Sequence, residues 1–167
     1  MGRLFGTDGI RGVANEYPLT AEGSFYIGRA AASFFQRPSR QTNILIGKDT
    51  RQSGTMIEKA LADGICSVGA DALLAGIIPT PAIASLVSAD DSAAGIVISA
   101  SHNPYTDNGI KLFDTEGYKR LLHILEVVER DTWQLFVDMH RYNDYAAKKR
   151  GAFMEVMRDI NSRLENG

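Results

Sequence analysis

The sequence alternates short apolar runs with segments of helical periodicity, and this alternation limits the fold more than any other feature. The runs that predict buried strands occupy residues 43–47, 71–76, 95–100 and 109–113. The helical patterns occupy residues 20–35 and 54–68, and a short one follows a proline-bracketed loop and ends near Ser88. A strand–helix–strand series is typical of crossovers on a mainly parallel sheet.

The last two strand runs are joined by a short loop, which cannot hold a parallel crossover. The fourth run is therefore expected to lie antiparallel to its neighbour. We predict an α/β fold with three α/β/α layers around a mixed, mainly parallel, four-stranded sheet. The glycine-punctuated segment at residues 3–16 is expected to form sharp bends.

The pattern changes beyond residue 116, so we expect residues 1–119 to form one α/β domain and residues 120–167 to form a divergent helical extension or linker. Apolar residues from Leu121 to Phe136 predict one long helix in that extension. A second stripe, from Phe153 to Leu164, predicts another helix.

Charge and composition exclude several classes of partner. The formal net charge of −2 argues against nucleic acid or an anionic membrane held by bulk charge. No apolar run approaches the roughly 18 residues of a membrane span. Cys66 is the single cysteine, so no disulfide framework or zinc site is expected. A reducing, cytoplasmic setting follows as the default.

The stretch VISASHNPYTDNGIKLF (97–113) interrupts two apolar runs with a polar cluster at Ser101, His102 and Asn103. Loops at the carboxyl ends of such strands are where sites usually form. Lys111, on the returning strand, is expected to point either into such a site or to solvent. The Asn-Pro and Asp-Asn-Gly signals favour a plain turn equally well. A Ser-His-acid hydrolase is disfavoured, because adjacent residues point apart and no G-x-S-x-G elbow is present.

Two further polar clusters are candidates for anion binding. Arg11, in FGTDGIRG, could bind a phosphate or could pair with Asp8 to brace the turn. Lys48 and Arg51, in GKDTRQSG, lie between a strand and a helix N-terminus. That segment is not a P-loop, and solvated charges beside a helix cap explain it as well.

Four motifs occur together in order and spacing: LFGTDGIRGVAN, IGKDTRQSG, VGADALLAGIIPTPA and GIVISASHNPYTDNGIKLF. Together they resemble the first domain of the phosphoglucosamine mutase branch of the α-D-phosphohexomutase superfamily. The resemblance covers residues 3 to about 119. It implies an enzyme that interconverts glucosamine 6-phosphate and glucosamine 1-phosphate through a phosphoserine and a bisphosphate intermediate.

The resemblance also implies roles for individual residues. Ser101 matches the serine that carries the transferable phosphoryl group, and Lys111 matches a lysine implicated in proton transfer. Arg11 matches an arginine beside the phosphoserine. His102 and Asn103 match loop partners of that serine, and Ser99 belongs to the same loop. The resemblance thus implies four catalytic residues: Ser101, His102, Lys111 and Arg11. A Mg²⁺ ion is implied as cofactor, bound to the phosphate on Ser101 and to an aspartate-rich loop of another domain.

The metal-binding, sugar-selecting and distal phosphate-binding motifs of this superfamily were not found in the 167 residues. We therefore expect the chain to be inactive alone. One alternative is a non-catalytic binding or dimerisation module, with a homodimer as one expected assembly and contacts from Trp133, Phe136, Tyr142 and Tyr145. Another is one part of a split enzyme.

Overall fold

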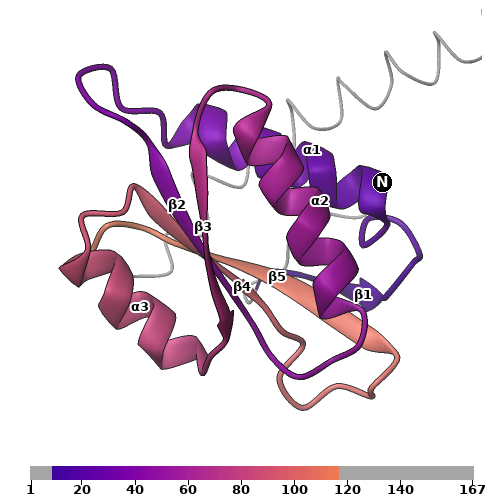
Figure 1. The fold of residues 1–167 in the computed structure, drawn as a ribbon. Helices are drawn as coiled ribbons and strands as arrows, with labels where there is room; N and C mark the ends of the chain where they lie inside the picture. The colour runs from indigo at the N-terminus through magenta and orange to yellow at the C-terminus, as the bar shows by residue number, and fades with distance from the viewer. Residues whose placement is uncertain (1–8, 117–167) are drawn as a thin grey trace, which may run out of the picture. The chain divides into compact units, whose positions relative to one another are not determined.

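The computed structural model describes residues 9–116, which contain five strands and three helices (Figure 1). Their order along the chain is β1 (Ile10–Val13), α1 (Ala21–Phe34), β2 (Asn43–Lys48), α2 (Gly54–Cys66), β3 (Asp71–Ile77), α3 (Thr80–Ala89), β4 (Ala94–Ile98) and β5 (Asp107–Phe113). Each helix and strand predicted within these residues is present, with ends shifted by a few residues. The prediction of an α/β fold is confirmed.

The strands form one mixed sheet in the order β1-β5-β4-β2-β3. Strand β2 pairs in parallel with both β3 and β4. Strand β5 runs antiparallel to β4, with Lys111 opposite Val97. The antiparallel direction predicted from the short loop is therefore confirmed.

The prediction of four strands is wrong, because β1 adds a fifth. It pairs antiparallel with β5, and Ile10 lies opposite Ile110. Ile10 is fully buried, so the pairing also brings an apolar side chain into the core. The four residues of β1 include Gly12 and follow Gly9, so they carry no readable period. Their partner strand lies about a hundred residues away in sequence.

Helices cover both faces of the sheet, which confirms the three layers. Figure 1 shows α1 and α2 on one side and α3 on the other. Alternate residues of β2 pack against opposite helical layers, because successive strand side chains point to opposite faces of the sheet. Ile44 and Ile46 pack with the cluster that contains α1 and α2, whereas Leu45 packs with Ile83 of α3.

Several predictions fall on residues 117–167 and lie outside the described residues. They are the helices expected at Leu121–Phe136 and Phe153–Leu164 and the domain boundary at residues 119 and 120. Among residues 9–116, no helix combines the length and the apolar character that crossing a membrane would require.

Helices α1 and α2 pack unusually closely where two glycines meet the facing backbone. A Cβ atom on Gly64 would lie 2.0 Å from the carbonyl oxygen of Phe25. A Cβ atom on Gly28 would lie 2.3 Å from the carbonyl oxygen of Leu61. Both contacts are with main chain, so only glycine fits without moving one helix away from the other.

We expect Gly64→Ala to lower the free energy of unfolding by about 1–3 kcal/mol, through overpacking, despite alanine's higher helix propensity. Urea denaturation followed by circular dichroism measures the change. Gly54→Ala is the matched control, because the nearest atom to its Cβ would be a side-chain atom, Lys48 Cδ, at the ordinary contact distance of 3.4 Å. A Gly64→Ala protein more stable than the wild type would contradict the close packing.

Candidate active site

The loop at residues 99–106 joins β4 to β5 and presents Ser101 at its surface. Ser101 has a φ of 55°, in the left-handed region that non-glycine residues seldom adopt. Its backbone N–H donates to Ser99 Oγ at 3.1 Å, and the N–H of Asn103 donates to the carbonyl of Ala100 at 3.1 Å. The turn predicted at Asn103-Pro104 is confirmed, and it exposes the serine. The turn predicted from Asp107-Asn108-Gly109 is wrong, because these residues belong to strand β5 and pair with β1.

Lys111 lies behind this loop and points toward Ser101. Only 6% of its surface is exposed, and its Nζ donates to Ser101 Oγ at 2.7 Å. Of the two orientations considered for this lysine, the structure has the one directed into the site. An ammonium at this distance can stabilise negative charge on Oγ or give it a proton.

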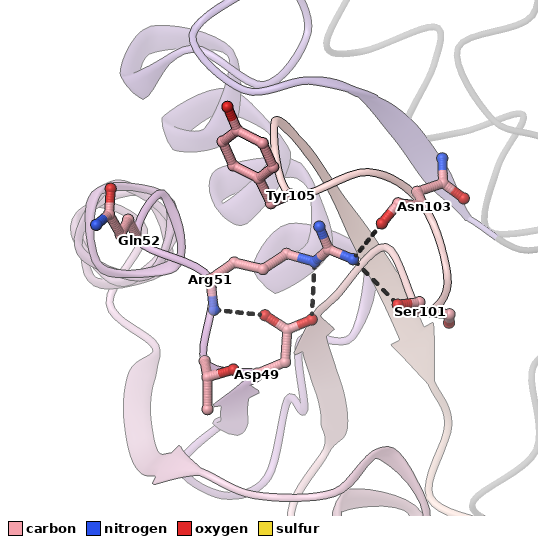
Figure 2. Close-up of a pocket in the computed structure, with 7 residues that line it drawn as sticks. Asp49, Arg51, Gln52, Ser101, Asn103 and Tyr105 are labelled. Carbon is pink, nitrogen blue, oxygen red and sulfur yellow. Dashed lines mark hydrogen bonds and ion pairs between the residues drawn. The ribbon is translucent and has the colours of Figure 1, made fainter.

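Arg51 connects the link after β2 to the Ser101 loop. Its Nε donates to Asp49 Oδ2 at 3.1 Å, and its backbone N–H donates to Asp49 Oδ1 at 3.0 Å. Its two terminal nitrogens donate to four carbonyls of the loop, at 3.0, 2.9, 2.5 and 3.1 Å, belonging to Ser101, Asn103, Pro104 and Asp107. Figure 2 shows the guanidinium between the Asp49 carboxylate and the loop.

The role predicted for Arg51 was anion binding, and that role stays a prediction. A guanidinium has five N–H donors. In this geometry Nε and both terminal nitrogens already donate hydrogen bonds to acceptors of the protein. The arrangement braces the loop. Lys48, the other candidate of this segment, forms an ion pair with Glu58 of α2, and its anion binding is likewise untested.

Strand β1 brings Arg11 to the same loop. Arg11 lies opposite Gly109 in the β1–β5 pair, and its Nη1 donates to Asn103 Oδ1 at 3.4 Å. Asn103 in turn donates from Nδ2 to Asp107 Oδ2 at 2.9 Å. Arg11 and Asn103 are therefore brought together beside Ser101. The pairing of Arg11 with Asp8 lies outside the described residues.

His102 is exposed at the tip of the loop, and its side chain makes no hydrogen bond to another residue within 9–116.

Sequence reasoning missed a buried tie beneath the loop. Asn108 is fully buried, donates from Nδ2 to Ser53 Oγ at 2.8 Å and accepts the N–H of Gly109 at 2.8 Å. This tie fastens β5 to the residue that precedes α2.

A cavity of about 680 Å³ opens beside Ser101. Its lining comes from the link after β2 and from the Ser101 loop: Asp49, Thr50, Arg51, Gln52, Ser101, Asn103 and Tyr105. Tyr105 is 88% exposed. Thr50, Gln52 and Tyr105 were not predicted, although the first two lie in the polar segment already singled out for Arg51.

The described residues do not form a metal cage. Within 9–116, no three His, Cys, Asp or Glu side chains are grouped as metal ligands would be. Asp49, which lines the cavity with Ser101, is paired with Arg51, and Asp107, at the end of the loop, accepts a hydrogen bond from Asn103. These residues alone therefore do not fit a bound Mg²⁺.

Two family models match the chain. The first, described as phosphoglucomutase/phosphomannomutase, alpha/beta/alpha domain I, matches residues 2–134. The second, described as TYRAAT1-like, C-terminal domain, matches residues 111–167 and shares residues 111–134 with the first. The described part of the chain, residues 9–116, lies within the match to the first.

Curated relatives agree with the first model. A phosphoglucosamine mutase of Syntrophus aciditrophicus (strain SB) is 63% identical over 119 residues, which are 71% of this chain and 26% of that protein. One of Citrifermentans bemidjiense is 59% identical over 119 residues, again 71% of this chain and 26% of that protein. The chain spans about a quarter of the length of these relatives.

Solved structures show the same fold. A putative phosphomannomutase from Thermus thermophilus superposes with a TM-score of 0.69 at 26% identity, covering 77% of this chain and 29% of that one. A phosphoglucomutase/phosphomannomutase family protein from Burkholderia thailandensis gives a TM-score of 0.66 at 26% identity, covering 80% of this chain and 30% of that one.

We expect Asn108→Ala to lower the free energy of unfolding by about 1–3 kcal/mol, because it leaves the buried N–H of Gly109 without its acceptor. Urea denaturation measures the loss. Thr106→Ala is the control, since its exposed hydroxyl makes only a 3.3 Å contact with Asp107. Equal stability of Asn108→Ala and the wild type would show that the tie contributes nothing.

Proposed function

The chain belongs to the phosphoglucomutase/phosphomannomutase family, and from this membership we propose that it is the phosphoserine domain of a phosphoglucosamine mutase. Support for this branch comes from relatives of that name at 63% and 59% identity. The observation that carries the proposal is the 2.7 Å contact between Lys111 Nζ and Ser101 Oγ, on an exposed loop beside a cavity.

The proposed reaction begins with a phosphoryl group on Ser101. The bond between phosphorus and Ser101 Oγ breaks as a bond forms to the 1-hydroxyl oxygen of glucosamine 6-phosphate. The sugar hydroxyl loses its proton and Oγ gains one, so atoms and charge balance. The bisphosphate then reorients, its 6-phosphoryl group returns to Ser101, and glucosamine 1-phosphate remains.

Lys111 is proposed as the group that supplies a proton to Ser101 Oγ when the phosphoryl group leaves. Its hydrogen bond to Oγ lies where negative charge develops in that step, and a buried cation acts there more strongly than one in water. In the returning step the same nitrogen would accept the proton of the Ser101 hydroxyl. This assignment agrees with the proton-transfer role that the resemblance implied.

The other predicted residues are proposed to shape the phosphate environment. Arg11 would add positive charge beside the phosphoserine, because its guanidinium reaches Asn103 of the loop. Ser99 holds the backbone of Ser101, and Asn103 spans Arg11 and Asp107. His102, exposed next to Ser101, is proposed as a loop partner of the phosphate. Phosphoryl transfer depends chiefly on such positioning and charge neutralisation.

Mg²⁺ stays a proposal drawn from the resemblance. The phosphate on Ser101 would offer it an oxygen ligand, and the remaining ligands would come from outside the described residues. A phosphosugar substrate and a cytoplasmic setting are proposed on the same ground. We expect no turnover by the 167 residues alone, since the metal, sugar and distal-phosphate motifs are absent from the printed sequence.

The aromatic residues behind the dimerisation alternative, at positions 133, 136, 142 and 145, lie outside the described residues. No observation within residues 9–116 favours that alternative over the mutase proposal.

A chimera tests the proposed function. Residues 1–119 of this chain would replace the matching segment of the Syntrophus aciditrophicus phosphoglucosamine mutase, and formation of glucosamine 1-phosphate would be assayed with Mg²⁺ and a hexose bisphosphate. We expect an active chimera that loses at least about 10³-fold in kcat on Ser101→Ala. Ser85→Ala, an exposed serine of α3, is the control and should keep the activity. A folded but inactive chimera, or an active Ser101→Ala variant, would contradict the proposal.

Lys111→Met in the same chimera tests the proton donor. Methionine fills the space of the buried side chain without the ammonium, so we expect kcat to fall by about 10²–10⁴-fold with little change in KM. Lys59→Met removes an exposed lysine of α2 that pairs with Asp63 and should leave both constants unchanged. An unaltered kcat in Lys111→Met would exclude Lys111 from proton transfer.

A further inference from the structure

We propose that Arg51, oriented by Asp49, is the positioning residue that holds the Ser101 loop in its reactive geometry, and that it binds no substrate anion. The holding of the loop stands on the structure alone. Its consequence for turnover rests on the proposed function. The distinction matters because an arginine at the start of a helix and beside a phosphate-carrying serine would ordinarily be assigned as a phosphate ligand.

The first support is the direction of the guanidinium. Its terminal nitrogens face main-chain carbonyls of the loop, and the bonds to Ser101 and Asn103 start from the same nitrogen, Nη2. Nη1 serves Pro104 and Asp107. The four acceptors lie between Ser101 and Asp107, so one planar group fixes the path of the chain from Ser101 to the start of β5.

The second support is the way Asp49 orients Arg51. One carboxylate accepts both the backbone N–H and the Nε–H of Arg51, which fixes the side chain at its base and near its end. Asp49 is itself placed by the sheet, since its N–H donates to the carbonyl of Ile98 at 3.0 Å. The Arg51 clamp, meaning the four hydrogen bonds from its terminal nitrogens to carbonyls of the loop, is thus anchored to the end of β4, the strand that leads into the loop.

The third support is burial. The Arg51 side chain is 12% exposed, although the cavity touches it. A phosphate could bind this guanidinium only by displacing carbonyls of the loop, and those carbonyls would then need other donors. Binding an anion here would therefore loosen the loop that has to carry the phosphoryl group.

The clamp matters because Ser101 adopts a conformation that a free loop would leave. A residue with φ near +55° persists only where the surroundings hold it. Arg51 holds the carbonyl of Ser101, while Ser99 holds its N–H and Lys111 meets its Oγ. Without the guanidinium, we expect Oγ to move away from Lys111 for much of the time.

The first experiment measures the loop directly, in the full chain and without any turnover. We expect Arg51→Lys to raise the amide hydrogen-exchange rates of Asn103 and Asp107, whose N–H groups close the turns of the loop, by about tenfold or more. Amides within β4 should keep their rates. Lysine retains the positive charge but lacks the planar set of donors that reaches four carbonyls.

Arg37→Lys is the matched control. Arg37 also ties a connecting segment through main-chain carbonyls, donating to Asp91 at 2.7 Å and to Ser92 at 2.9 Å. These residues precede β4, at the end of that strand opposite to Ser101. A general loss of stability would raise exchange in both variants, whereas the clamp predicts a change in the Ser101 loop for Arg51→Lys alone.

Asp49→Asn is a second, milder variant, which still tests the clamp if Arg51→Lys does not fold. The amide can accept from Arg51 with one oxygen only, so one of the two orienting bonds is lost while the four carbonyl bonds can still form. We expect a smaller rise in loop exchange, about threefold, between those of the wild type and Arg51→Lys. An exchange pattern identical to the wild type in both Asp49→Asn and Arg51→Lys would overturn the clamp.

The kinetic experiment uses the chimera described above. A positioning residue predicts a fall in kcat of about 10–100-fold for Arg51→Lys, with KM for the sugar phosphate changed by less than about threefold. A phosphate ligand predicts the reverse, a KM at least about tenfold higher with kcat retained, and that result would overturn the proposal. If the unmutated chimera were inactive, the proposed function would fail while the exchange experiment still tested the clamp.

Discussion

The antiparallel pairing of β4 with β5 is the contact on which the candidate site depends. It sets Lys111 opposite Val97, and the connection between the two strands is the Ser101 loop itself. The ladder that orders the sheet therefore also closes the loop and brings the lysine ammonium to 2.7 Å from Ser101 Oγ. Main-chain hydrogen bonds of the ladder fix the position of Lys111, and side-chain contacts from Arg51 and Ser99 hold Ser101 beside it.

Polar groups beneath the loop support this arrangement from three parts of the fold. Lys111 and Asn108 come from β5, Ser53 precedes α2, and Arg51 belongs to the link after β2. Burying such groups is costly unless each finds a partner. Here the partners belong to the loop or to its anchoring residues, so the stability of the domain and the geometry of the site depend on the same hydrogen bonds.

The order of the strands along the chain and their parallel or antiparallel directions could be predicted because apolar periodicity and loop length are local properties of the chain. The approach of Lys111 to Ser101 could be predicted in part, since a return strand after a short loop must lie beside the strand before it. The strand β1 could not be predicted, because it has four residues and its partner is distant in sequence. Arg51 was recognised as a candidate, but its acceptors are main-chain carbonyls 50 to 56 residues further along the chain.

Pattern and motif along the chain thus sufficed for the α/β architecture, for the position of Ser101 at a strand end and for the choice of family. Folding in three dimensions settled which charged groups face the serine and which face the backbone. Lys48 and Arg51 lie three residues apart with the same charge, yet one pairs with Glu58 of α2 and the other clamps the loop. The physical reason is that every residue carries a backbone carbonyl, so the sequence does not show which carbonyls will accept from Arg51. Their directions are set only when the strands and loops assemble.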